Sequence, residues 1–292
     1  MTQVIDFIGG EYRNRTGVHG FAIRCVTTPP TRRRVGLSIA WFFRGARRYR
    51  ASRLVAVGKV LWQDVIKETR RMSLEMSNYS SRRTMMVDTQ IRPSDVTKFP
   101  IIDAMLSVAR EAFVPDDMKE AAYVGENLEL GVGRVMLEPR TLAKMLDALN
   151  IQSDELVLDI GCGLGYSAAV IARMAEAVVA VEEDEAMAGE AQSVLSSNGI
   201  DNAAVVEAAL TVGAPKHGPY DVITIQGGVA EVPPTILDQL KEGGRLCALF
   251  MEDALGVVRV GYKIDGQISW RFSFNASAPV LPGFEKKRVF AL

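Results

Sequence analysis

From Glu155 onward, short apolar runs alternate with segments of helical pattern, and this alternation constrains the fold more than any other feature. The apolar runs are LVLDI, AVVAVE, AAVVEA, DVITIQ, RLCALF and GVVRVGYKI. Helical patterns separate them at residues 167–174, 185–197 and 234–241, whereas residues 211–219 are rich in turn-forming types. Apolar strands that alternate with helices are typical of a parallel sheet covered on both faces. We therefore predict a doubly wound, mostly parallel α/β sheet, and allow for antiparallel strands near the C-terminus, where QISWRFSFNA alternates.

Residues 76–150 are predicted to form a helical segment that covers the sheet domain, which we place at residues 151–292. Apolar residues recur at near-helical spacing over residues 101–112, and Pro115 is expected to end that helix. A glycine-containing loop is expected next. Pro139 then occupies a position at which a second helix can begin, because proline suits the first helical turn.

The first 75 residues differ chemically from the rest of the chain. Residues 1–75 contain 15 Lys and Arg against 5 Asp and Glu, whereas the remaining residues contain 19 against 30. Such a segment is consistent with an arm that binds nucleic acid, with a targeting segment, or with an amphipathic helix at residues 51–71. It is equally consistent with a start codon placed too early, since Met72 and three later methionines offer other starts. We expect a disordered or wrongly included extension, and we do not expect nucleic acid as a partner.

Composition narrows the class of function. The three cysteines form no CxxC pair, which favours a reducing compartment, so we expect a cytoplasmic protein. The sequence contains only two histidines, which are few candidates for zinc ligands or for the histidine of a Ser–His–Asp triad. We therefore expect no metal. The longest apolar runs are well short of the ~20 residues that a membrane helix needs, so no membrane partner is expected.

The stretch ELVLDIGCGLGYSAAVIARM places three glycines between the first strand and its helix. Glycines at that point let the backbone turn tightly and approach a ligand. A phosphate-binding loop needs a lysine after the glycines, which is missing, and the dinucleotide fingerprint needs a glycine where Tyr166 stands. The pattern D-x-G-x-G-x-G is instead the first motif of S-adenosylmethionine-dependent methyltransferases. Its members here are Asp159, Gly161, Gly163 and Gly165.

Two acids complete the predicted cofactor site. Asp159, just before the turn, is expected on the ammonium side of the methionine head, either in direct contact or through water. Glu182 ends the next strand, 17 residues after Gly165. A carboxylate is an acceptor that can take two donors at once, so Glu182 is predicted to accept both ribose hydroxyls.

From about Arg82 to Gly244 the chain resembles the protein-L-isoaspartate O-methyltransferases. The resemblance is carried by RRTMMVDTQI, SVAREAFVPDDMKEAAYVGENLELGVG, LVLDIGCGLGYSAAVIARM and GPYDVITIQGGVAEVPPTILDQLKEGGRL. It implies a Rossmann-like methyltransferase fold with S-adenosyl-L-methionine as cofactor. It also implies transfer of a methyl group to the carboxylate of an isoaspartyl residue in a protein or peptide, which begins the repair of aged proteins.

The chain departs from the family pattern at two places. The family loop reads G-Q-T-I-S-Q-P, whereas this chain has GRVMLEP, so that Val135 and Leu137 replace hydroxyl residues and Glu138 replaces a glutamine. The family G-D-G, whose aspartate faces the adenine, aligns with AAL, which leaves Ala209 without an acceptor. Leu137 and Glu138 are therefore the predicted substrate-loop positions.

These departures leave three hypotheses open. The chain is an isoaspartyl methyltransferase, a methyltransferase of the same lineage with another substrate, or a cofactor-binding or interaction module without turnover. An isoaspartyl carboxylate is already ionised near neutral pH, so the reaction needs no general base. If Glu138 faces the substrate, two carboxylates at ~4 Å would repel each other by ~4 kcal/mol at an effective dielectric of ~20. We therefore predict weak isoaspartyl methylation.

Overall fold

The computed structural model describes residues 11–13, 19–21, 78–131, 133–252 and 255–286. The chain divides into two compact units, residues 1–67 and residues 68–292. In the first unit, β1 (Glu11–Arg13) pairs antiparallel with β2 (His19–Phe21). Both strands lie in a stretch where the sequence shows no strand periodicity. The other interpretations of residues 1–75 concern residues outside the described ranges, and the predicted domain limits stay predictions.

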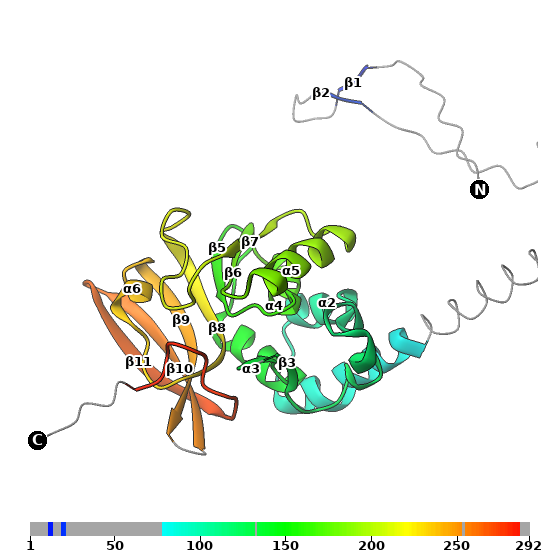
Figure 1. Ribbon diagram of the computed structural model, residues 1–292. Coiled ribbons are helices and arrows are strands. Elements are labelled where there is room, and N and C mark those ends of the chain that lie inside the picture. The colour runs from blue at the N-terminus through cyan, green and yellow to red at the C-terminus, as the bar shows by residue number, and fades with distance from the viewer. Residues whose placement is uncertain (1–10, 14–18, 22–77, 132, 253–254, 287–292) are drawn as a thin grey trace, which may run out of the picture. The chain divides into compact units, whose positions relative to one another are not determined.

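The second unit is built on a seven-stranded sheet with the order β11-β10-β9-β8-β5-β6-β7 (Figure 1). Its five parallel strands are β5 (Leu156–Ile160), β6 (Ala177–Glu182), β7 (Ala203–Glu207), β8 (Tyr220–Val229) and β9 (Leu240–Glu252). The antiparallel strands β10 (Leu255–Ile264) and β11 (Gln267–Ala276) follow at one edge. The predicted mostly parallel α/β sheet is confirmed, including its antiparallel C-terminal strands.

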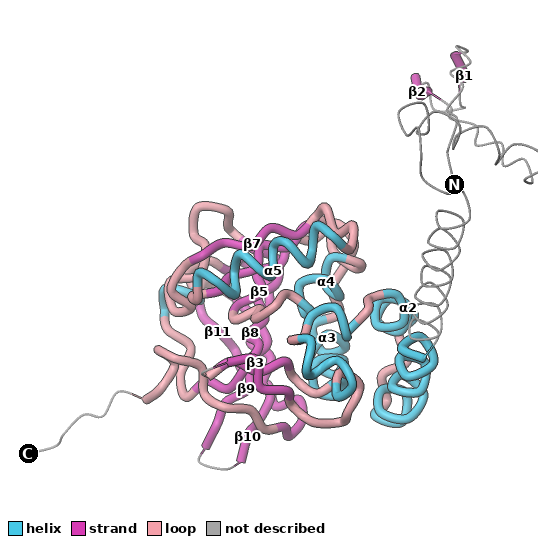
Figure 2. Tube along the Cα trace, turned by 45° about the vertical axis from the view of Figure 1, so that its right-hand side comes forward, coloured by secondary structure: helices cyan, strands magenta, loops and turns pink. Residues whose placement is uncertain are grey.

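Helices cover one face of the sheet. They are α2 (Phe99–Ser107), α3 (Pro139–Leu149), α4 (Tyr166–Ala172) and α5 (Glu185–Ser197). Figure 2 shows α2, α3 and α4 gathered on the same side of the strands. A helix at residues 78–86 continues into the π-helical turn η1 (Val87–Ile91) and the 3₁₀ turn η2 (Arg92–Ser94), and supplies buried Met86, Val87 and Ile91 to the same core. The N-terminal helical cover is thus part of the main hydrophobic core.

The opposite face is covered mainly by short segments. A second core cluster joins Leu210, Ile236 of α6 (Pro234–Leu237), Leu281 and Phe284 to the sheet strands. Residues 279–284 run beside the carboxyl end of β8, where the Leu281 amide donates to the Gly228 carbonyl at 2.8 Å. The C-terminal segment therefore covers the carboxyl end of β8, and its Leu281 also lies against Gly161 in the turn after β5.

Three predicted elements differ from the structure. The helix expected over residues 101–112 ends at Ser107, because Val108 and Ala109 are extended, before the 3₁₀ turn η3 (Arg110–Phe113) begins. The break directs the Arg110 side chain inward, where its Nε and Nη2 atoms donate to the carbonyls of Ala122 and Leu137 at 2.6 and 2.8 Å. A local hydrophobic period cannot reveal this long-range contact.

The other two differences come from strand pairing. The helix expected over residues 234–241 stops at Leu237, because Leu240 already pairs with Tyr220 in the sheet. The glycine-containing loop expected after Pro115 contains the 3₁₀ turn η4 (Asp116–Ala121) and then a hairpin of β3 (Leu128–Gly131) and β4 (Arg134–Met136). The two strands have four and three residues, too few for a period to be recognised in the sequence.

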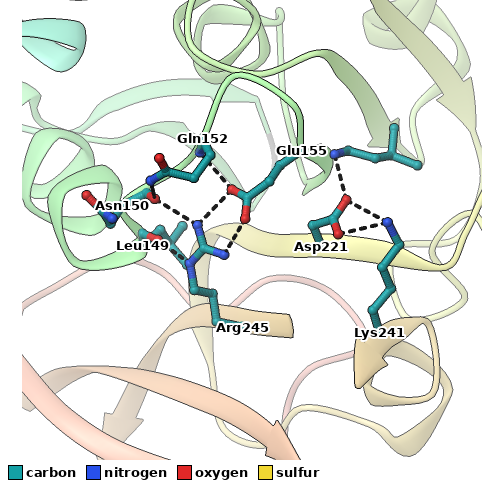
Figure 3. Close-up of polar contacts among 8 residues, drawn as sticks. Leu149, Asn150, Gln152, Glu155, Asp221, Lys241 and Arg245 are labelled. Atoms are coloured by element: carbon teal, nitrogen blue, oxygen red, sulfur yellow. Dashed lines mark hydrogen bonds and ion pairs between the residues drawn. The ribbon is translucent and has the colours of Figure 1, made fainter. Parts of the chain in front are cut away.

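A polar cluster ties α3 to the amino ends of the strands, away from the glycine turn (Figure 3). Arg245 forms a bidentate ion pair with Glu155, with nitrogen–oxygen distances of 2.7 and 2.8 Å, and also donates to the carbonyls of Leu149 and Asn150. Nearby, the Asp221 carboxylate accepts from Lys241 Nζ at 2.7 and 2.8 Å and from the Leu156 amide at 2.9 Å. These contacts satisfy the last carbonyls of α3 and fix the start of β5.

Candidate active site

The glycine turn lies between β5 and α4. Gly161, Gly163 and Gly165 all have positive φ values, of 74°, 56° and 94°. The Gly161 amide donates to the carbonyl of Val181 in β6 at 2.8 Å, which joins the turn to the end of the neighbouring strand. Because residues with a Cβ rarely adopt this conformation, the three glycines are required by the backbone path of the turn itself.

Asp159 lies beneath the turn and is fully buried. Its Oδ2 accepts from Ser167 Oγ at 2.6 Å, and its Oδ1 accepts from Gln226 Nε2 at 2.7 Å. Burial raises the pKa of this carboxyl to about 6, against the lowering effect of the two hydrogen bonds, and the charge of Glu182 adds to the rise. Asp159 therefore fixes the start of α4 against β8.

Glu182 lies where the sequence predicts it, at the end of β6 and against the glycine turn. Its Oε2 accepts from the Gly163 amide at 3.0 Å. Its Oε1 accepts from the amides of Glu183 and Asp184 at 2.8 and 3.3 Å, and from Arg134 Nε at 2.8 Å. Glu182 is 0% exposed and Arg134 is 6% exposed, so this ion pair is buried. The carboxylate expected to accept ribose hydroxyls is thus occupied by an arginine of the same chain.

Side chains also fill the space over the glycines. Leu130 Cδ1 lies 2.7 Å from the position that a Cβ on Gly163 would take, and Leu281 Cδ1 lies 3.3 Å from the corresponding position on Gly161. The cavity beside the turn has a volume of about 10 Å³, roughly the space for one water molecule. The residue types fit a nucleoside cofactor, but in this conformation the site has no room for one. The assignment of Asp159, the three glycines and Glu182 to cofactor binding stays a prediction.

The substrate-loop positions differ in their surroundings. Leu137 is buried and lines the small cavity together with Val135. Glu138 does not line that cavity: its Oε1 accepts from Thr141 Oγ1 at 2.6 Å and lies 3.6 Å from Arg140 Nη1. In this conformation the Glu138 carboxylate is therefore directed to Thr141 and Arg140 and not to that cavity. The assignment of both positions to substrate contact stays a prediction.

Other reactive groups near the turn are inert or distant. Burial raises the pKa of the Cys162 thiol well above its ordinary value, and the charges of Asp159 and Glu182 raise it further. His217 is exposed in the turn-rich segment. Within the described ranges, no three His, Cys, Asp or Glu side chains gather as a metal ligand set. No helix of those ranges is long and apolar enough to cross a membrane.

Sequence reasoning missed three residues of this site. Arg134 and Gln226 come from the β3–β4 hairpin and from β8, and Ser167 comes from the first turn of α4. The arginine follows a glycine in GRVMLEP, and the glutamine ends the apolar run DVITIQ, so each was visible as a polar residue at the end of an element. Which carboxylate each one meets depends on the order of the strands.

Comparisons with known proteins agree on one family. The family model described as protein-L-isoaspartate(D-aspartate) O-methyltransferase matches residues 81–270. Protein-L-isoaspartate O-methyltransferase 2 of Pelobacter propionicus is 37% identical over 191 residues, which are 64% of this chain and 85% of the relative. Protein-L-isoaspartate O-methyltransferase 1 of Syntrophobacter fumaroxidans is 36% identical over 171 residues, which are 59% and 80%.

Solved structures show the same likeness. A protein-L-isoaspartate O-methyltransferase aligns with a TM-score of 0.60 at 25% identity, over 70% of this chain and 66% of that chain. A Plasmodium falciparum structure described by the same activity, in complex with S-adenosyl-L-homocysteine, aligns with a TM-score of 0.59 at 21% identity, over 70% and 97%. The second likeness concerns the fold.

Proposed function

Because the chain belongs to the protein-L-isoaspartate(D-aspartate) O-methyltransferase family, we propose that it transfers a methyl group from S-adenosyl-L-methionine to a carboxylate of a protein or peptide substrate. The substrate group that the family name indicates is the carboxylate of an isoaspartyl residue. The main structural support for a cofactor site here is that the glycine turn after β5 and the acid at the end of β6 lie together. The Gly163 amide donates to Glu182 at 3.0 Å.

The residues that would hold the cofactor are those of the turn and of the two strand ends. Once the contacts that cover them are released, Gly161 and Gly163 would present backbone without side chains, and Glu182 would present acceptors suited to ribose hydroxyls. S-adenosylmethionine supplies the methyl group on a positively charged sulfur. Asp159, held by Ser167 and Gln226, stabilises the base of the turn.

The contribution of the protein to this reaction is positioning and exclusion of water. The acceptor carboxylate is already ionised near pH 7, because its ordinary pKa is ~4, so no general base is required. Holding the acceptor in line with the methyl group in a dry site supplies the catalysis. The buried apolar residues Val135 and Leu137 would exclude water from this position.

A second candidate is methyl transfer to another acceptor. It is favoured by Val135 and Leu137, which line the cavity beside the turn with apolar groups where the family loop has hydroxyls. Losing one neutral hydrogen bond costs only about 0.5–1.5 kcal/mol, so the isoaspartyl reaction would be slowed and would not be abolished by this change alone.

Label transfer to a peptide distinguishes the candidates. The full chain is incubated with radiolabelled S-adenosylmethionine and an isoaspartyl peptide, with the matched aspartyl peptide as control. Base-labile label on the isoaspartyl peptide alone supports the first candidate. Cofactor binding without label on either peptide points to another acceptor, whereas no binding of S-adenosylhomocysteine by calorimetry rejects the methyltransferase proposal.

We place this activity in the cytoplasm. The two described cysteines, Cys162 and Cys247, are both buried and free. Free thiols are typical of proteins kept in a reducing compartment.

A further inference from the structure

We propose that Arg134 is an internal competitor of the cofactor: it occupies the carboxylate of Glu182 and must leave before the ribose hydroxyls can bind there. The inference rests on the proposed function and adds a residue that sets the affinity of the same site. Arg134 is the first residue of β4, and Glu182 is the last residue of β6, so their contact joins the hairpin to the sheet.

Among the described residues, four groups donate hydrogen bonds to Glu182, and one of them can be withdrawn without moving the turn or the strand end. Three of them are backbone amides, of Gly163, Glu183 and Asp184, which belong to the turn and to the strand end themselves. The fourth is the Arg134 guanidinium, which comes from a different element. An ionised carboxylate has about four acceptor positions, so two ribose hydroxyls cannot be added while all four donors stay.

The hairpin blocks the turn at a second point. Leu130 of β3 lies against the bare backbone of Gly163, so that a Cβ there would meet its Cδ1 atom at 2.7 Å. Leu130 and Arg134 lie on the two opposite strands of one short hairpin. Withdrawal of the hairpin would therefore free both the glycine surface and the acid.

Arg134 has a second partner at the protein surface. Its Nη2 atom lies 3.8 Å from Glu183 Oε2, and the Glu183 side chain is 47% exposed. A guanidinium that leaves Glu182 can therefore remain paired with Glu183 without being left buried and unpaired, which is the costly outcome. This neighbouring acid makes opening of the site feasible.

Calorimetric titration of the full chain with S-adenosylhomocysteine tests the proposal. Arg134→Gln, which introduces the residue of the family loop, is expected to lower Kd at least tenfold, equivalent to about 1.4 kcal/mol. Arg245→Gln is the matched control, because it also removes an arginine from an ion pair with a glutamate but at a distance from the glycine turn, and it is expected to leave Kd within twofold. Thermal denaturation of each variant verifies that it is folded.

Glu183→Gln provides an independent arm that leaves Arg134 in place. Without its surface partner, Arg134 is expected to leave Glu182 less readily, so Kd should rise about threefold in the otherwise unchanged chain and stay constant in the Arg134→Gln background. If the unchanged chain and Arg134→Gln have equal Kd values, the proposal that Arg134 competes with the cofactor is rejected, whereas the proposed function is not affected. Absence of binding by every folded variant overturns the proposed function together with it.

Discussion

Replacement of Asp159 by asparagine is expected to stabilise the protein at neutral pH. Burial raises the pKa of this carboxyl from its ordinary 3.8 to about 6 in the folded chain. The folded state therefore holds its proton more tightly than the unfolded state, and ionisation costs stability as pH rises from about 4 to about 6. The difference between the two pKa values corresponds to about 3 kcal/mol at pH 7 and to roughly half of that at pH 5.

Asparagine resembles the protonated acid and does not incur this cost. Its Oδ1 can still accept from Gln226 Nε2, and its Nδ2 can donate to Ser167 Oγ, so both hydrogen bonds of Asp159 have a counterpart. Urea denaturation of both proteins at pH 7 and pH 5 gives the two differences in unfolding free energy. We expect Asp159→Asn to be more stable by about 3 kcal/mol at pH 7, and the advantage to fall by about half at pH 5.

Asp221→Asn is the matched control, with the opposite sign. Although burial alone would raise the pKa of Asp221, hydrogen bonds from Lys241 and from the Leu156 amide hold it below its ordinary value. Such a carboxylate stabilises the fold above its unfolded pKa and loses that contribution as pH falls. Asp221→Asn should therefore destabilise at pH 7. The reasoning is refuted if Asp159→Asn lowers stability at pH 7, or if its advantage grows as pH falls.

Three further outcomes are expected. Gly163→Ala should lower the unfolding free energy by about 1–2 kcal/mol for the positive φ alone, measured by urea denaturation, and should abolish binding of S-adenosylhomocysteine by calorimetry. Leu137→Ser should raise label transfer to an isoaspartyl peptide, while Glu138→Gln alone should change it less than twofold because this carboxylate does not line the cavity; the opposite ranking would reject that placement. Arg245→Gln should lower the unfolding free energy by about 2 kcal/mol, between the values for exposed and for fully buried pairs, and the loss should shrink in a Glu155→Gln background.

Local patterns were sufficient to predict the parallel part of the sheet. Each strand from β5 to β7 is a short apolar run bounded by turn residues. The N-cap of α5 is Asp184, whose side chain accepts from the Met187 amide at 2.8 Å. Such signals lie within a few residues of one another, so the bounds of α5 follow from the sequence. The position of Glu182 against the turn follows as well, because the carboxyl ends of neighbouring parallel strands meet at one edge.

By itself, the sequence determined which elements form and which chemical groups lie at their ends: a turn that favours glycines, and acids at the carboxyl ends of two buried strands. The tertiary structure alone decided what meets those acids. Arg134 is 48 residues from Glu182, and Gln226 is 67 residues from Asp159. Their pairing depends on strand order and on the hairpin closing over the turn, and no local period or motif carries that information.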